Sequence, residues 1–128
     1  PQHRRAADAL RGLAASSMPW GVPWPCVHEF LAVVTNHRIF ADPSPADVAL
    51  SFLDEIAAHP FHTHLGETGS HLDVLGRLLR SSGTTGARVH DARIAAICLT
   101  NGVRELWTAD RDFSWFPELR TRNPLVES

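Results

Sequence analysis

Apolar residues recur at helical spacing over several long segments of the chain. In residues 3–15, Ala6, Leu10 and Leu13 fall on one side of a helix and arginines fall on the other. The same pattern predicts four further helices, over residues 25–36, 45–58, 68–81 and 90–101. Proline begins the first two of these four, and glycine follows the last two, which are the usual signals of helix starts and ends.

Short runs of apolar and β-branched residues separate these helices. They predict strands over residues 20–24, 61–65 and 103–108, an edge strand over residues 119–124, and a loop or short helix from Asp110. Alternating helices and strands are typical of an α/β fold with a mostly parallel sheet. The chain nevertheless opens on a helix, whereas the first strand of an open parallel sheet is often central. We therefore expect residues 1–128 to form a single domain that lacks its N-terminal strand, and that strand to precede Pro1 in the natural protein.

Composition excludes several classes of protein. Hydrophobic residues make up 44% of the 128 residues, which is enough to bury a core and excludes wholesale disorder. The net charge of -2 excludes a binder of nucleic acid that relies on a bulk basic surface. No apolar run approaches the roughly 18 residues of a membrane span, so no membrane partner is expected. Cys26 and Cys98 form no C-x-x-C pair, which favours reduced thiols in a cytoplasmic protein over a disulfide between them.

Four carboxylates from three separate segments are expected at one edge of the predicted sheet. Glu29 lies early in the helix after the first strand, Asp91 begins the apolar fifth helix, and Asp110 and Asp112 follow the third strand. Ligands of open α/β sheets bind beyond the carboxyl ends of the strands. Clustered carboxylates suit Mg²⁺ or Mn²⁺, which prefer oxygen ligands.

Each of these acids also has an ordinary structural explanation. Asp91 is placed to cap its helix, where a negative charge meets the positive end of the helix dipole. Asp110 and Asp112 fit ordinary turn positions, and Glu29 is free to pair with an arginine. The residue pattern alone leaves these alternatives open.

Two motifs make the chain similar to a known family. The segments are PWPCVHEFLAVVTN, which carries Glu29, and GARVHDARIAAICLTNGVRELWTADRDF, which carries the three aspartates; a helical hairpin joins them. Over essentially its whole length the chain resembles PIN-domain ribonucleases, in particular VapC-type toxins of bacterial toxin–antitoxin systems. The resemblance implies a three-layer α/β/α fold and a Mg²⁺-dependent endoribonuclease, with Mn²⁺ as a substitute ion.

The resemblance also assigns roles to individual residues. Glu29, Asp91 and Asp110 match the family's acidic positions, Asp112 matches an additional acid, and Thr108 matches a polar position in the same pocket. The family has one more acid, at the end of its first strand, and nothing in this sequence matches it.

Substrate and partner expectations follow from the same resemblance. Arg88, Arg93 and Arg111 flank the acids and are candidates to contact RNA phosphates, with solvated or acid-paired arginines as the alternative. The family implies a homodimer and a cognate VapB-type antitoxin that covers the acidic site. The apolar surfaces of residues 3–15 and 45–58 are the candidate faces for these partners.

Three other functions compete with a ribonuclease. The first is a catalytically inactive PIN-like scaffold that only binds protein. The second is a zinc site at His59, His62 and His64, for which no cysteine lies nearby and for which exposed or hydrogen-bonded histidines are the alternative. The third is a small RNA-binding module using the G-x-x-G of residues 83–86, which helix termination by Gly83 explains better.

Overall fold

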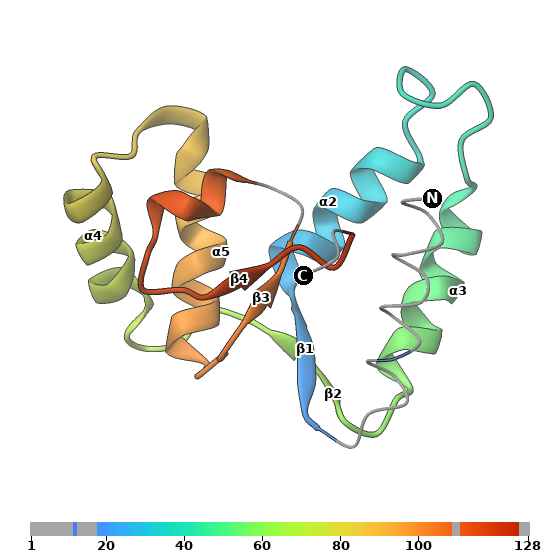
Figure 1. Ribbon diagram of the computed structural model, residues 1–128. Helices are drawn as coiled ribbons and strands as arrows, with labels where there is room; N and C mark the ends of the chain where they lie inside the picture. The colour runs from blue at the N-terminus through green and yellow to red at the C-terminus, as the bar shows by residue number, and fades with distance from the viewer. Residues whose placement is uncertain (1–11, 13–17, 109–110, 126–128) are drawn as a thin grey trace. The chain divides into compact units, whose positions relative to one another are not determined.

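A computed structural model describes residues 12, 18–108 and 111–125 of the chain (Figure 1), with the backbone alone for Arg111 and Asp112. The chain divides into two compact units. We call residues 16–65 the α2–α3 unit and residues 66–128 the α4–α5 unit. The predicted helix over residues 3–15 lies outside the described residues except for Gly12, which is helical. The expectation of a single domain stays a prediction.

The α2–α3 unit consists of two helices and one pair of strands. Its elements are β1 (Trp20–Pro23), α2 (Trp24–Val34), α3 (Ala46–Ala57) and β2 (His62–Leu65). Proline stands in the first turn of α2 and at the residue before α3, where a fixed backbone angle and a missing N–H cost a helix nothing. Thr35 ends α2, and its Oγ1 donates a hydrogen bond of 2.6 Å to the carbonyl of Leu31. Both helices and both strands confirm the predicted elements to within a few residues.

Strands β1 and β2 run parallel and approach each other closely. Trp20 pairs with His62, and Val22 pairs with His64. At Gly21 the neighbouring strand is so near that a Cβ atom would lie 2.6 Å from the carbonyl oxygen of Thr63. Glycine in a strand interior marks such a close backbone approach.

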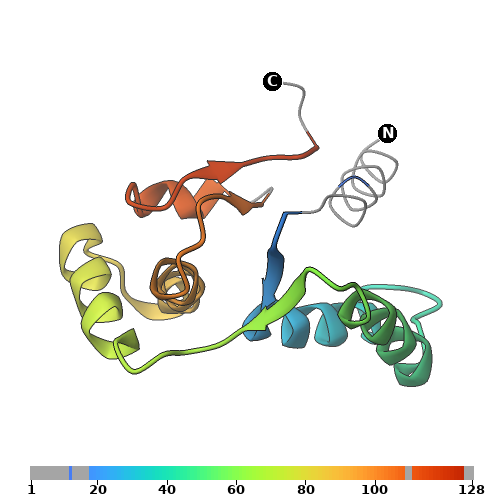
Figure 2. The same ribbon diagram turned by 90° about the horizontal axis from the view of Figure 1, so that it is seen from below.

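The α4–α5 unit is built around one buried helix. Its elements are α4 (His71–Ser82), the 3-10 helix η1 (Gly86–Arg88), α5 (Val89–Thr100), β3 (Leu106–Trp107), the 3-10 helix η2 (Arg111–Trp115) and β4 (Thr121–Arg122). Helices α4 and α5 pack side by side (Figures 1 and 2). Helix α5 is buried at Ala92 and from Ile94 to Cys98, and Leu78, Phe113, Phe116 and Leu119 complete this core. The nearly all-apolar sequence of α5 therefore has the burial that such a composition requires.

Strands β3 and β4 are shorter than the sequence pattern predicts. Both have two residues, although the predictions were residues 103–108 and 119–124. Val103 instead closes α5, because its N–H donates to the carbonyl of Cys98 after Gly102 turns into the left-handed region at φ 70°. Leu119 likewise closes the turn after η2, with its N–H on the carbonyl of Phe116.

The described strands hydrogen-bond in two pairs, β1 with β2 and β3 with β4. Both pairs are parallel, which confirms the predicted α/β class with parallel strands. Both cysteines are free thiols, as expected, and burial together with the nearby carboxylate of Glu29 raises the pKa of Cys26 to about 11. Within the described ranges, no helix is long and apolar enough to cross a membrane.

Candidate metal centre

Asp91 occupies a rigid position at the start of the core helix. It lies in the first turn of α5, half-buried, one residue before the completely buried Ala92. The N-terminal end of a helix favours negative charge there. The backbone that carries this carboxylate is thus fixed by the core of the α4–α5 unit.

Glu29 lies on α2, in the other unit, and is exposed. Among the residues that the structure describes it makes no ion pair with an arginine, so the structural alternative that the sequence left open has no support. Its negative charge acts on Cys26, one turn away on the same helix, where it adds to the rise in the thiol pKa. The carboxylate is therefore accessible to a cation.

The third segment of the predicted centre is described only in part. Thr108 directly follows β3, and its N–H donates to the carbonyl of Arg122 at 2.9 Å, which pins the carboxyl end of the strand. Asp110 and the side chain of Asp112 lie outside the described residues. Among those that are described, no group of three or more His, Cys, Asp and Glu side chains is placed to hold a metal ion. The clustering of the four carboxylates stays a prediction.

Two of the three candidate phosphate-binding arginines are engaged within the fold. The Arg93 guanidinium forms an ion pair of 2.8 Å with Glu67, and its hydrogen bond holds the pKa of Glu67 below its usual value. The guanidinium of Arg88 lies over the ring of Trp115, 4.9 Å from its centroid. The third candidate, Arg111, has its side chain outside the described residues.

The histidines of β2 form an aromatic cluster with two tryptophans. His62 and His64 share a strand face, as predicted, with ring centroids 4.5 Å apart. Trp20 packs edge-on to His62 at 4.7 Å, and Trp24 stacks on His64 at 4.2 Å. Burial, with smaller effects of His64 and His59, lowers the pKa of His62 below its ordinary 6.5. Both imidazoles therefore pack against tryptophan rings, and in the described part of the chain no third ligand is placed beside them.

The G-x-x-G segment terminates a helix. Gly83 adopts the left-handed conformation at φ 68° and its N–H donates to the carbonyl of Leu79, which caps α4. The Ser82 hydroxyl donates to the Thr84 hydroxyl at 2.6 Å, and Thr84 is buried. This local explanation agrees with the helix signal in the sequence.

The sequence pattern did not predict an exposed tryptophan with charged neighbours at β3 and β4. Trp107 of β3 contacts Glu105, which directly precedes the strand, and Arg122 on the neighbouring strand. The signal was present as alternation, since Glu105 and Trp107, and likewise Arg120 and Arg122, stand two residues apart. It was hidden because the pairing of the two segments is not local.

Comparison with known proteins extends over nearly the whole chain. No protein-family model matches the sequence. Ribonuclease VapC31 of Mycobacterium tuberculosis is 32% identical over 124 residues, which cover 97% of this chain and 87% of that protein. Ribonuclease VapC25 of the same organism is 32% identical over 126 residues, covering 98% and 88%. Ribonuclease VapC33 is 30% identical over 127 residues, covering 99% and 88%.

Proposed function

Because the chain belongs to the VapC family of ribonucleases, we propose that it is the endoribonuclease toxin of a type II toxin–antitoxin system and hydrolyses RNA phosphodiester bonds. The observation that carries this proposal is similarity to ribonucleases over 97% or more of the chain. The position of Asp91 supports it, because a carboxylate fixed at the start of a core helix suits a catalytic centre.

We assign a divalent cation, Mg²⁺ with Mn²⁺ as a substitute, to the carboxylates of Glu29, Asp91, Asp110 and Asp112. The donor chemistry fits, because hard cations of this kind take carboxylate oxygens and keep several waters. The exposure of Glu29 leaves its carboxylate accessible from solvent, and Asp91 is half-buried. When bound, the cation lowers the pKa of a water and offsets charge on the phosphate.

The chain's own residues perform the remaining work. Asp91 provides a fixed point of negative charge, since α5 cannot shift without disturbing the core. Thr108 stands at the pinned carboxyl end of β3, where its hydroxyl would hydrogen-bond a water of the centre. Asp112 would orient a second water or complete the ligand set.

We propose two protein partners. An acidic site attracts a cationic segment of a VapB-type antitoxin, because complementary charge speeds and directs association. A second copy of this chain fits α3, where Val48 and Phe52, one turn apart on the helix, are both exposed. Light scattering of the purified protein tests the homodimer, and a monomer at micromolar concentration would contradict it.

Asp91→Asn tests the proposed activity. The change keeps the shape of the side chain and removes its charge, so we expect RNA cleavage in Mg²⁺ to fall at least about tenfold, since even outer-shell partners of a metal typically contribute that much. Asp73→Asn is the matched control, because Asp73 also lies in the first turn of a helix in the same unit.

Three outcomes of this experiment are decisive. Cleavage that chelation abolishes, that Asp91→Asn weakens and that Asp73→Asn leaves intact supports the proposal. Full cleavage by Asp91→Asn contradicts the assigned centre. Wild-type protein that is folded but cleaves no RNA in Mg²⁺ or Mn²⁺ favours the inactive scaffold.

A further inference from the structure

An aromatic and charged group lies at the β3–β4 pair, and we call it the Trp107 face. It consists of Trp107 of β3 and Arg122 of β4, with Glu105 and Arg120, which directly precede the two strands. Trp107 pairs directly with Arg122 in the parallel register. The guanidinium of Arg122 lies over the indole ring, 5.4 Å from its centroid, and the indole N–H of Trp107 donates to a carboxylate oxygen of Glu105 at 2.8 Å. These two contacts place all three side chains on one side of the strands.

The indole of Trp107 is held in place yet accessible. It is 36% exposed although both its ring face and its N–H have partners. A side chain that is already ordered loses little further entropy when a ligand packs against it. An exposed ring fixed in this way is suited to stacking, whereas a freely rotating surface tryptophan would lose entropy on binding.

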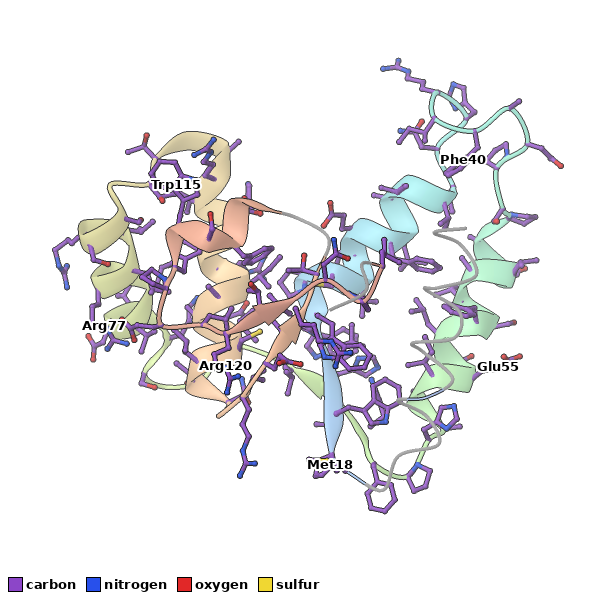
Figure 3. All side chains as sticks on the ribbon, in the orientation of Figure 1. Met18, Phe40, Glu55, Arg77, Trp115 and Arg120 are labelled. Atoms are coloured by element: carbon purple, nitrogen blue, oxygen red, sulfur yellow. The ribbon has the colours of Figure 1, made fainter. Side chains whose placement is uncertain are left out.

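The charge of the face favours an anionic ligand. Arg120, labelled in Figure 3, is exposed, and in the described part of the chain it makes no ion pair. Arg122 is exposed as well and contacts the ring rather than a carboxylate. The Trp107 face therefore exposes two guanidinium groups and one carboxylate, that of Glu105. Arg93, by contrast, is neutralised by Glu67.

The Trp107 face adjoins the segment that carries the proposed metal ligands. The N–H of Thr108 is bound to the carbonyl of Arg122, so Trp107 and Arg122 both stand at the carboxyl ends of their strands. Asp110 follows Trp107 by three residues, and three residues of chain span at most about 11 Å. A ligand on this face is therefore close to the segment where we propose that cleavage occurs.

We propose that the Trp107 face binds single-stranded RNA, with an unpaired base stacked on Trp107 and phosphates contacted by Arg120 and Arg122. This inference rests on the proposed ribonuclease function and adds to it the residues that hold the substrate. Unpaired bases offer flat rings to an aromatic side chain, and guanidinium groups suit phosphates. A duplex hides its bases inside the stack, so only its phosphates are available to this face.

Binding without cleavage provides the test. Fluorescence anisotropy of a short, labelled, mixed-sequence single-stranded RNA is measured with the full chain in excess EDTA, where metal-dependent cleavage is stopped. Trp107→Ala is expected to raise Kd by about five- to a hundredfold, which is the effect of losing one stacked base, whereas Trp107→Phe keeps a ring and stays close to wild type. Arg122→Ala is expected to reduce the slope of log K against log salt by about 0.7.

Arg80→Ala is the control, because Arg80 is an exposed arginine on α4 and not on the Trp107 face. It is expected to leave Kd unchanged. In cleavage assays with Mg²⁺, Trp107→Ala is expected to raise KM while kcat stays near wild type, as loss of uniform binding predicts. Thermal unfolding of each variant separates lost binding from lost structure, and the rescue by Trp107→Phe makes the same distinction.

The outcomes separate this inference from the function on which it rests. If wild-type protein cleaves RNA and Trp107→Ala binds RNA as tightly as wild type, the inference is wrong and the ribonuclease function stands. If Trp107→Ala instead weakens only the binding of an antitoxin, the face serves a protein partner, and the inference is equally wrong. If the wild-type protein cleaves no RNA, the proposed function itself fails.

Discussion

Gly21→Ala is expected to destabilise the β1–β2 pair strongly. The added methyl carbon would lie 2.6 Å from the carbonyl oxygen of Thr63, and 3.0 and 3.2 Å from Cγ and Cδ2 of Leu65. The nearest of these atoms belongs to the backbone of the paired strand, so it cannot rotate away. Relief requires the two strands to separate, and separation lengthens the hydrogen bonds that join them.

The size of the effect follows from these distances. A contact of 2.6 Å must open by at least 0.4 Å to reach 3.0 Å, the lower limit for real Cβ contacts. Overpacking of this kind costs about 1–3 kcal/mol, and the backbone contact places Gly21→Ala near the upper end. A loss of about 3 kcal/mol lowers Tm by about 10 °C in a chain of this size.

Thermal unfolding followed by circular dichroism measures the change. Gly69→Ala is the matched control, because a Cβ at Gly69 meets no atom within 4 Å and its backbone has no positive φ. We expect Gly69→Ala to lie within about 0.5 kcal/mol of wild type. If Gly21→Ala matched that control, the close approach of the two strands would be refuted.

Two further changes test the core and the histidine cluster. Leu78 on α4 is 1% exposed, so Leu78→Ala should lower the free energy of unfolding in urea by about 2–5 kcal/mol. Leu72 is 78% exposed, so the control Leu72→Ala should stay within about 0.5 kcal/mol of wild type. Equal losses would contradict the packing of α4 on α5. The pKa of His62 is lowered in the folded state, so the unfolded state binds the proton more tightly. The contribution of His62 to the free energy of unfolding is therefore fully present above pH 6.5, and it is lost as the pH falls below that value. Between about pH 7.5 and about pH 5.5, the Tm of His62→Phe should therefore fall less than the Tm of wild type. An identical fall in both proteins would exclude His62 as the cause of the pH dependence.

Periodic segments were predictable because their signal is local. Helices α4 and α5 carry their apolar spacing and their terminal glycines within a dozen residues, and both form close to the expected bounds. The predicted strands after α5 were too long. Residues that favour strands do not reveal that the N–H of Val103 closes the helix. Hydrogen bonding at the helix end, rather than residue preference, sets where β3 begins.

Residue pairs far apart in the sequence were not predictable. Arg93 flanks the acids in the sequence, but its partner Glu67 stands 26 residues earlier. Arg77, labelled in Figure 3, bonds both carboxylate oxygens of Glu118 across 41 residues. Nothing local in the sequence distinguishes these arginines from those left available, such as Arg120. The acids at segment ends were identifiable because strand and helix ends are themselves local features.

The burial of α5 has a consequence for how the protein adapts to substrates. A helix buried at Ala92 and from Ile94 to Cys98 has little room for rigid-body movement, so we expect Asp91, a proposed metal ligand, to move little. If RNA binds as we propose, adjustment to differently shaped RNA is expected in β3 and β4, which pair through two residues apiece. Mutations that broaden or narrow target choice are therefore expected to accumulate in those short strands and to spare the helix.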